Sequence, residues 1–199
     1  MRKAILHLKT ADPVLAAIID QVGSYRMSYD EPSFASLAEA IVYQQLHGKA
    51  AATIFKRLTD LAGLPLNPEG ILKLSDAQMR AAGLSKQKLS YLRDLAAKTH
   101  SGEVQFSHLP GLSDDDVIKE LTKVKGIGVW TAHMFLIFSL RRVNVLPTGD
   151  LGIQMAMRKH YRKRKLPKPA QMEKIATPWE PYRTVACWYL WRSLDIKTL

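Results

Sequence analysis

Apolar residues recur at helical spacing along almost the whole chain, and this periodicity is the feature that most constrains the fold. The clearest case is one helix face formed by Phe34, Leu37, Ala38, Ile41 and Val42. Ser33 stands where the N-cap of that helix is expected. No stretch shows sustained strand-like alternation, and only residues 142–146 indicate a short extended segment. The pattern therefore predicts an all-α protein.

The same periodicity predicts further helices along the chain. They cover residues 48–63, 68–74, 75–82, 85–99, 113–124, 129–140, 151–161 and 181–194. The sequence contains no repeat of fixed period and no Gly/Ser-rich linker. Any division of the 199 residues is therefore expected to be into helical lobes.

The chain is strongly basic, with 29 Lys and Arg against 18 Asp and Glu and a net charge of +11. No acidic residue occurs between Asp150 and Glu173, where seven cations gather: Arg158, Lys159, Arg162, Lys163, Arg164, Lys165 and Lys168. Such a cluster is a solvated loop, a disordered basic segment or a surface that faces phosphates. Because the whole chain is basic, we favour a polyanionic partner, with nucleic acid ahead of membrane.

Composition excludes several other classes of protein. A single cysteine, Cys187, excludes internal disulfides and four-cysteine metal sites, and we expect no metal. No apolar run approaches the ~20 residues of a membrane span, and the N-terminal stretch lacks a secretory core. We therefore expect a protein of a reducing compartment that is not secreted: cytoplasm or nucleoid in a bacterium, the nucleus in a eukaryote. We also expect a monomer.

A tight turn joins two of the expected helices at Gly126-Ile127-Gly128. Glycine permits positive φ and close approach of another backbone. The helix after the turn begins with N–H groups that bind phosphate oxygens, and Lys125 adds a cation beside them. The alternative is an ordinary helical hairpin. Because Thr131-Ala132 follows the turn and apolar residues precede it, we favour a helix-hairpin-helix that clamps the DNA backbone.

A second motif, Leu146-Pro147-Thr148-Gly149-Asp150-Leu151-Gly152-Ile153, follows about twenty residues later. Together with the hairpin it resembles the helix-hairpin-helix–Gly/Pro–Asp superfamily of DNA glycosylases, in particular the 3-methyladenine-DNA glycosylase II branch in its compact form. The blocks at residues 40–51, 83–96 and 179–192 agree with that branch. The resemblance implies a central lobe of residues 33–146, with the hairpin at 117–140, and a terminal lobe of 1–32 plus 147–199. A cleft between them would hold the base.

The resemblance implies a monofunctional DNA repair enzyme that excises flipped alkylated bases from damaged duplex DNA. Asp150 would be the catalytic carboxylate, whereas Asp150 taken alone is more often a helix N-cap. Trp130, Met134 and Trp191 would line the base pocket; the alternative, which we favour less, is that they pack in the core. Trp130 stands where bifunctional relatives have a lysine that forms an imine, and tryptophan cannot form one.

The remaining positions implied by the resemblance contact DNA. They are Gln44, Gln45, Leu46 and His47, Lys125 to Val129 with Thr131, and Arg183. His47 would fill the gap left by the flipped nucleotide, and an ion pair explains Arg183 equally well. No cofactor is expected, apart from a monovalent cation on hairpin carbonyls. Two alternatives remain: a glycosylase for another base lesion, and a non-catalytic helix-hairpin-helix DNA-binding module.

Overall fold

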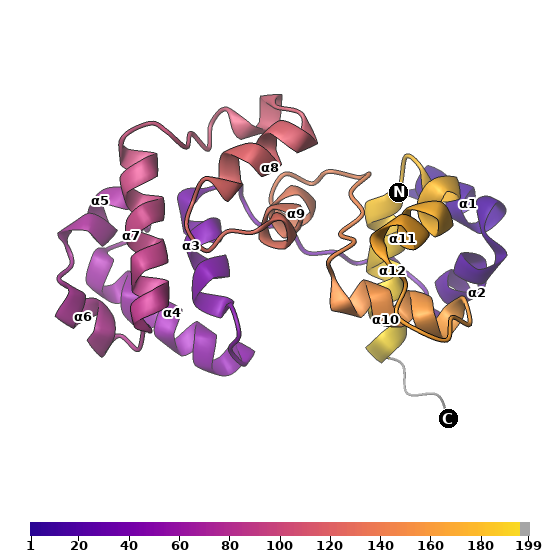
Figure 1. Cartoon of the computed structure of the whole chain (residues 1–199), viewed down its shortest axis with the longest axis horizontal. Coiled ribbons are helices and arrows are strands. Elements are labelled where there is room, and N and C mark those ends of the chain that lie inside the picture. The colour runs from indigo at the N-terminus through magenta and orange to yellow at the C-terminus, as the bar shows by residue number, and fades with distance from the viewer. Residues whose placement is uncertain (196–199) are drawn as a thin grey trace. The chain divides into compact units, whose positions relative to one another are not determined.

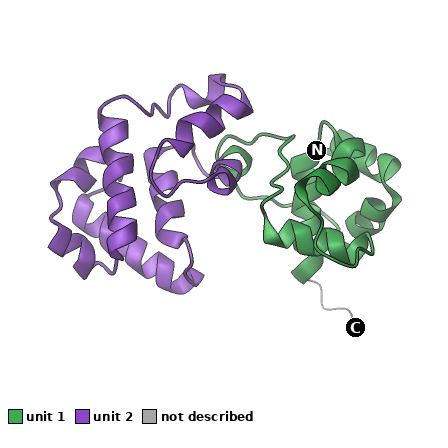
Figure 2. Ribbon diagram, viewed as in Figure 1, with its two compact units in different colours: residues 1–29, 136–199 green, residues 30–135 purple. Residues whose placement is uncertain are grey.

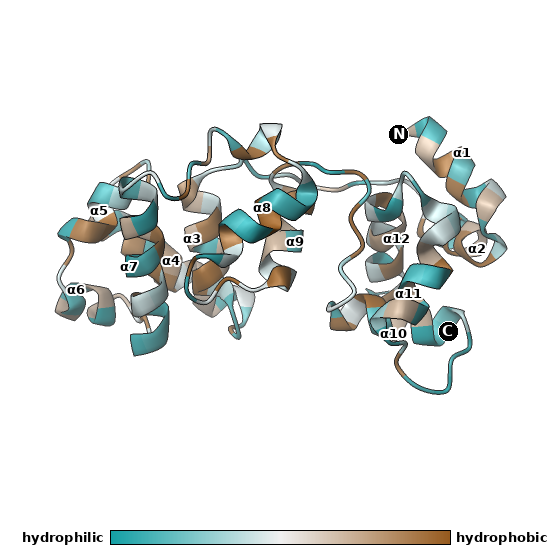
Figure 3. Ribbon diagram, turned by 45° about the horizontal axis from the view of Figure 1, so that its top comes forward, coloured by the Kyte–Doolittle hydropathy of each residue, from teal (hydrophilic) through white to brown (hydrophobic). Residues whose placement is uncertain are grey.

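A computed structural model describes residues 1–195, and these form helices and no strand. The expected all-α class is confirmed. The chain divides into two compact units (Figures 1 and 2), one of residues 1–29 and 136–199 (unit 1) and one of residues 30–135 (unit 2). Along the helices of both units hydrophilic and hydrophobic residues alternate, as Figure 3 shows. No helix within residues 1–195 combines the length and apolar character that a membrane crossing needs.

Unit 2 contains most of the helices that the sequence predicts, together with one short 3₁₀ helix, η1, that it does not. They are α3 (Phe34–Tyr43), α4 (Gly48–Ala62), α5 (Pro68–Lys73), α6 (Asp76–Ala81), α7 (Lys86–His100), the 3₁₀ helix η1 (Leu109–Gly111), α8 (Asp114–Thr122) and the first part of α9 (Val129–Phe138). Their apolar stripes meet in a core in which Leu37, Ile41, Leu58 and Leu92 are fully buried. Burial of this kind stabilises each such side chain by ~1.5–3 kcal/mol.

Serine caps begin several helices of unit 2, and the cap at Ser33 confirms the prediction made for that residue. Ser33, Ser85 and Ser113 each accept a backbone hydrogen bond from the third helical residue. Some predicted ends are wrong by a turn or less. The helix expected to reach residue 124 ends at Thr122, where the chain turns toward Gly126, although Val124 is still buried.

Unit 1 contains α1 (Arg2–Ala11), α2 (Pro13–Val22), α10 (Leu151–His160), α11 (Pro169–Ala176), the 3₁₀ helix η2 (Thr177–Trp179) and α12 (Arg183–Asp195). The sequence analysis missed α1, α2 and α11. Helix α1 buries only Ala4 and Leu8, so its apolar stripe is too sparse to be recognised. Helix α11 follows a basic loop, and its first residue, Pro169, reads equally well as part of that loop.

Asp12 connects these missed helices to the core of unit 1. Its Oδ1 caps α2 by accepting from the backbone N–H groups of Val14 and Leu15 at 2.9 and 3.1 Å. Its Oδ2 accepts from Tyr161 Oη at 2.6 Å and from Trp179 Nε1 at 2.8 Å. One buried carboxylate therefore joins three segments that lie far apart in the sequence.

Residues 142–146 are not a strand, and α12 takes up their hydrogen bonds. Thr184 N donates to Val143 O at 3.0 Å, and Thr184 Oγ1 donates to Arg142 O at 2.7 Å. Val145 N in turn donates to Thr184 Oγ1 at 3.0 Å. These bonds attach the segment to α12, so residues 136–146 group with unit 1 rather than with the lobe expected to end at residue 146.

Candidate catalytic and nucleic-acid-binding site

Asp150 is the N-cap of α10, and its carboxylate is held by two fixed donors. Its Oδ1 accepts from Ile153 N at 2.8 Å and from Trp191 Nε1 at 2.8 Å. The residue is only 8% exposed. The N-terminal end of a helix stabilises a negative charge, and both donors restrict where the carboxylate can lie. Asp150 is thus both a cap and a preorganised anion.

Trp191 reaches this carboxylate from α12. Its ring stacks on Phe138, with ring centroids 5.9 Å apart and an interplanar angle of 23°. The close approach depends on Gly152, where a Cβ would lie 3.1 Å from both Asp150 Oδ1 and Trp191 Cδ1. The structure therefore brings two predicted site residues of unit 1 into direct contact. The sequence analysis quoted Gly152 only as part of a motif and missed this spatial role.

Cys187 of α12 is fully buried and close enough to the carboxylate of Asp150 to feel its charge. Burial raises the pKa of its thiol well above the usual range, and the negative charge of Asp150 raises that pKa further. The thiol is therefore protonated at neutral pH. A buried neutral thiol is a packing residue and not a nucleophile.

The predicted hairpin joins α8 to α9 in unit 2. Gly126 has φ +80°, and a Cβ there would lie 2.1 Å from Tyr91 Cδ2, so no side chain fits at this position. Ile127 N donates to Val124 O at 3.1 Å and closes the turn. Val129 at the start of α9 is exposed, as are Lys125 and Gly128. The turn therefore presents the first N–H groups of a helix at the surface, as phosphate binding requires.

Not every hairpin residue presents its side chain. Ile127 and Thr131 are 5% and 6% exposed, so only their backbone is available to a phosphate. Lys125 is partly occupied by Asp94: its backbone N donates to Asp94 Oδ2 at 2.8 Å, and its Nζ lies 3.9 Å from Asp94 Oδ1. The sequence analysis missed Asp94, which precedes the hairpin by about thirty residues. From α7 it holds the backbone at Lys125, where the hairpin turn begins.

The loop between α3 and α4 contacts the hairpin. Gln44 Nε2 donates to Gly126 O at 3.0 Å. Gln45 has φ +57°, which turns the chain sharply and leaves Leu46 and His47 exposed. His47 is the N-cap of α4 but makes no capping bond with its side chain. The structure thus brings two predicted DNA-contacting segments of unit 2 together, with the imidazole of His47 at the surface.

A pocket of about 830 Å³ opens between this loop and the hairpin. Its lining includes Trp130 and Met134 of α9, together with Tyr43 and Tyr91. Trp130 is 46% exposed, so it is not a core residue. Lys88 also lines the pocket; its Nζ donates to Val42 O at 2.6 Å, and burial lowers its pKa. An aromatic, partly apolar pocket of this size accommodates a planar base.

The guanidinium of Arg183 forms ion pairs within the protein and is not free to contact a DNA phosphate. One guanidinium nitrogen lies 2.6 Å from Glu180 Oε1 and 3.5 Å from Glu173 Oε2, and the side chain is 18% exposed. These contacts correspond to the ion-pair alternative and not to a phosphate contact. The two glutamates follow the basic segment, and their pairing depends on the packing of α11 against η2.

Among residues 1–195 no group of three His, Cys, Asp or Glu side chains could hold a metal ion. At the hairpin, Val124 O and Gly126 O each already accept one hydrogen bond. A carbonyl oxygen has a second lone pair. The monovalent cation at these carbonyls stays a prediction.

Comparison with known proteins identifies the family. Residues 38–181 match the model of the HhH-GPD superfamily of base excision DNA repair proteins. DNA-3-methyladenine glycosylase 1 of Schizosaccharomyces pombe is 38% identical, over 97% of this chain and 87% of its own length. A solved structure of the S. pombe 3-methyladenine DNA glycosylase Mag1 in complex with abasic DNA has a TM-score of 0.85 at 37% identity, covering 98% of this chain and 97% of the other. A DNA-3-methyladenine glycosidase from Bacillus halodurans also has a TM-score of 0.85 at 37% identity, over 94% and 87% of the two chains. The chain therefore belongs to the HhH-GPD superfamily of base excision DNA repair proteins.

Proposed function

We propose that the protein is a monofunctional DNA glycosylase that removes alkylated purines, such as 3-methyladenine and 7-methylguanine, from duplex DNA. The observation that carries the proposal is the carboxylate of Asp150, buried at the start of α10 and held by Ile153 N and Trp191 Nε1. The likeness to proteins named 3-methyladenine glycosylases over nearly the whole chain supports the substrate class. The product is an abasic site.

The chemistry needs a fixed anion beside the sugar. As the N-glycosidic bond lengthens, C1′ becomes positively charged, and a preorganised carboxylate stabilises that charge without having to reorganise. Asp150 meets this need because its two donors hold Oδ1 in place. It can also orient or deprotonate the attacking water. The glycosidic bond is inaccessible inside a duplex, so the nucleotide must be extruded at a cost of a few kcal/mol.

Alkylation makes the leaving base cationic, so its glycosidic bond is already weakened. Aromatic rings such as Trp130 and Trp191 attract a cation by ~0.5–2 kcal/mol, which is too little for strict selection. We therefore expect bond lability and ease of extrusion to supply most of the selectivity. Single-turnover excision of 7-methylguanine should be much faster than that of 8-oxoguanine from otherwise identical duplexes. Faster release of 8-oxoguanine would instead identify a glycosylase for oxidised bases, with the same role for Asp150.

Strand cleavage by the protein itself is not expected. Trp130 cannot form an imine with the abasic sugar, and Lys125 lies before the hairpin glycines. Borohydride added during turnover should therefore trap no covalent protein–DNA adduct. A parallel reaction with endonuclease III provides the positive control. A robust adduct with this protein would show a bifunctional enzyme, and Lys125→Gln would then test whether Lys125 is the nucleophile.

His47→Ala should weaken binding to an abasic-site analogue about tenfold, within the ~1–3 kcal/mol of one aromatic stacking contact. His47 is exposed and does not cap its helix, so its removal should leave the fold intact. A side chain that fills the gap left by a flipped nucleotide acts only where such a gap exists. Affinity for undamaged duplex should therefore change little. Lys49→Ala, the neighbouring exposed cation, is the control and should weaken binding to both DNAs equally. Equal weakening by His47→Ala would make His47 a backbone contact.

A further inference from the structure

The seven cations of the basic segment, residues 158–168, remain at the surface of unit 1. All seven are exposed: Arg158, Lys159, Arg162, Lys163, Arg164, Lys165 and Lys168. Some cations elsewhere, such as Lys9, Lys56 and Arg93, pair with carboxylates. Within residues 1–195 none of the seven forms such a pair. The segment therefore concentrates uncompensated positive charge on one part of unit 1.

The segment begins on α10 and turns sharply at its end. Arg162 has φ +51° at the position after the C-cap Tyr161, where glycine is usual. Lys163 N donates to Arg158 O at 3.0 Å and closes the turn. A pocket of about 530 Å³ follows, lined by five of the seven cations together with Met155 and Leu194. The turn thus gathers cations from α10 and from the following loop around one hollow.

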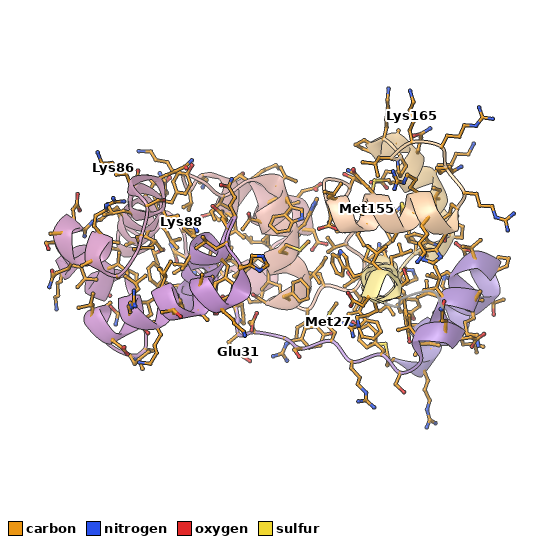
Figure 4. The ribbon with its side chains drawn as sticks, turned by 90° about the horizontal axis from the view of Figure 1, so that it is seen from below. Met27, Glu31, Lys86, Lys88, Met155 and Lys165 are labelled. Atoms are coloured by element: carbon orange, nitrogen blue, oxygen red, sulfur yellow. The ribbon has the colours of Figure 1, made fainter. Side chains whose placement is uncertain are left out.

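One exposed face of α10 connects this segment to Asp150. Leu151, Met155 and Arg158 are exposed and follow each other at helical spacing. Figure 4 shows Met155 on α10 and Lys165 beyond it, among side chains that project from the ribbon. A helix of ten residues is ~15 Å long, which equals about four to five base pairs at 3.4 Å each. A DNA backbone that runs along this face of α10 from Asp150 therefore reaches the cations within half a turn of the duplex.

We propose that this face of α10 and the basic segment form a second phosphate-binding surface, which holds duplex DNA about four to five base pairs from the nucleotide at Asp150. The proposal rests on the proposed function for the position of the target nucleotide. The ligand is the phosphate backbone because the segment offers seven cations and contains no Asn, Gln, Asp or Glu side chain that would read a base edge. An anionic membrane is less suitable, since the large apolar residues exposed on this surface are Leu151, Met155 and Leu166, which are too few for the continuous apolar face of a helix that lies on a membrane.

The first test measures salt dependence on undamaged duplex, which requires no excision. Arg158→Gln/Arg164→Gln/Lys165→Gln removes three cations of the surface. The slope of log K against log [salt] should become shallower by about 3, because each phosphate contact contributes ~0.9. Between 50 and 200 mM salt the parent should then lose about 40-fold more affinity than the variant. Arg2→Gln/Lys3→Gln/Lys174→Gln is the matched control: the same charge change in the same unit, at exposed residues outside the surface.

The control variant should keep nearly the parental slope. An unchanged slope in the Arg158/Arg164/Lys165 variant would overturn the proposal, and so would equal changes in both variants, which would indicate net charge alone. Binding should also be compared on phosphatidylserine vesicles. A variant that loses vesicle binding but not duplex binding would assign the surface to membranes and overturn the proposal.

The second test locates the surface relative to the target. Two truncated duplexes are made, each with an abasic-site analogue three base pairs from one end: the 5′ end in the first and the 3′ end in the second. In one of the two, the shortened flank cannot reach the basic segment. The parent should bind one of the two truncated duplexes more weakly than a centred duplex, and the Arg158/Arg164/Lys165 variant should not. Equal sensitivity of both proteins to truncation would overturn the assigned position. If the protein excises no alkylated base but the first test succeeds, only the proposed function fails.

Discussion

Asp150→Asn is expected to lower single-turnover base excision by about 100- to 1,000-fold while duplex binding stays close to that of the parent. This is the usual loss when one preorganised electrostatic group is removed from a transition state. Asn and Asp are nearly equal as N-caps, and the amide oxygen can still accept from Ile153 N and Trp191 Nε1. The substitution therefore removes the negative charge and keeps the local structure. Release of 7-methylguanine at saturating protein measures the effect.

Asp12→Asn provides a matched control for this experiment. Asp12 is also a buried N-cap in unit 1, and its carboxylate likewise accepts from a tryptophan Nε1. If the charge of Asp150 acts on the sugar, only Asp150→Asn should lower excision by the folded protein to this extent. Near-parental excision by Asp150→Asn would contradict the catalytic role. If Asp150→Asn fails to fold, the main role of Asp150 is to cap α10 and not to stabilise the transition state.

Asp12→Ala should reduce the free energy of unfolding by at least about 3 kcal/mol. The loss of an N-cap costs ~1 kcal/mol. Two further donors, Trp179 Nε1 and Tyr161 Oη, lose their acceptor, and each buried unsatisfied group costs ~1–3 kcal/mol. Trp179 is fully buried, so water cannot replace the carboxylate there without opening the core. For a chain of this size the melting temperature should fall by about 6–12 °C.

Urea denaturation followed by tryptophan fluorescence measures this loss, because Trp179 itself lies in the affected core. Asp20→Ala is the control. Asp20 pairs with Lys9 at the surface, and its side chain is 66% exposed, so its removal should change stability by less than about 1 kcal/mol. A loss below about 1 kcal/mol for Asp12→Ala would mean that the network around Asp12 contributes little to stability.

The local pattern of the sequence was sufficient for the helices of unit 2 and for the position of Asp150. Ser33, Ser85 and Ser113 cap helices because a serine hydroxyl satisfies a neighbouring N–H group whatever the tertiary structure. Gly126 and Gly128 indicate the hairpin because glycine permits the tight turn that other residues resist, which is also a local property of the chain. The assignment of Asp150 depended on a motif, since its sequence neighbourhood alone is that of any N-cap.

Three features required the tertiary structure. Helix α1 has too few buried residues for its periodicity to be recognised, and it is stabilised by packing against α2, η2 and α12. The contact of Trp191 with Asp150 spans 41 residues, and no local rule indicates which side chain meets the carboxylate. Arg183 likewise pairs with Glu173 only because α11 lies beside it.

The sequence by itself therefore determined the helical class, most helix starts, the family motif and the excess of positive charge, since each depends on residues a few positions apart. Only the tertiary structure decided which partners hold Asp150, which side chains surround Trp130 and which cations remain unpaired. These properties depend on hydrogen bonds and ion pairs between distant segments. Each such contact is worth only about 1–3 kcal/mol, and whether it forms depends on how the whole core packs.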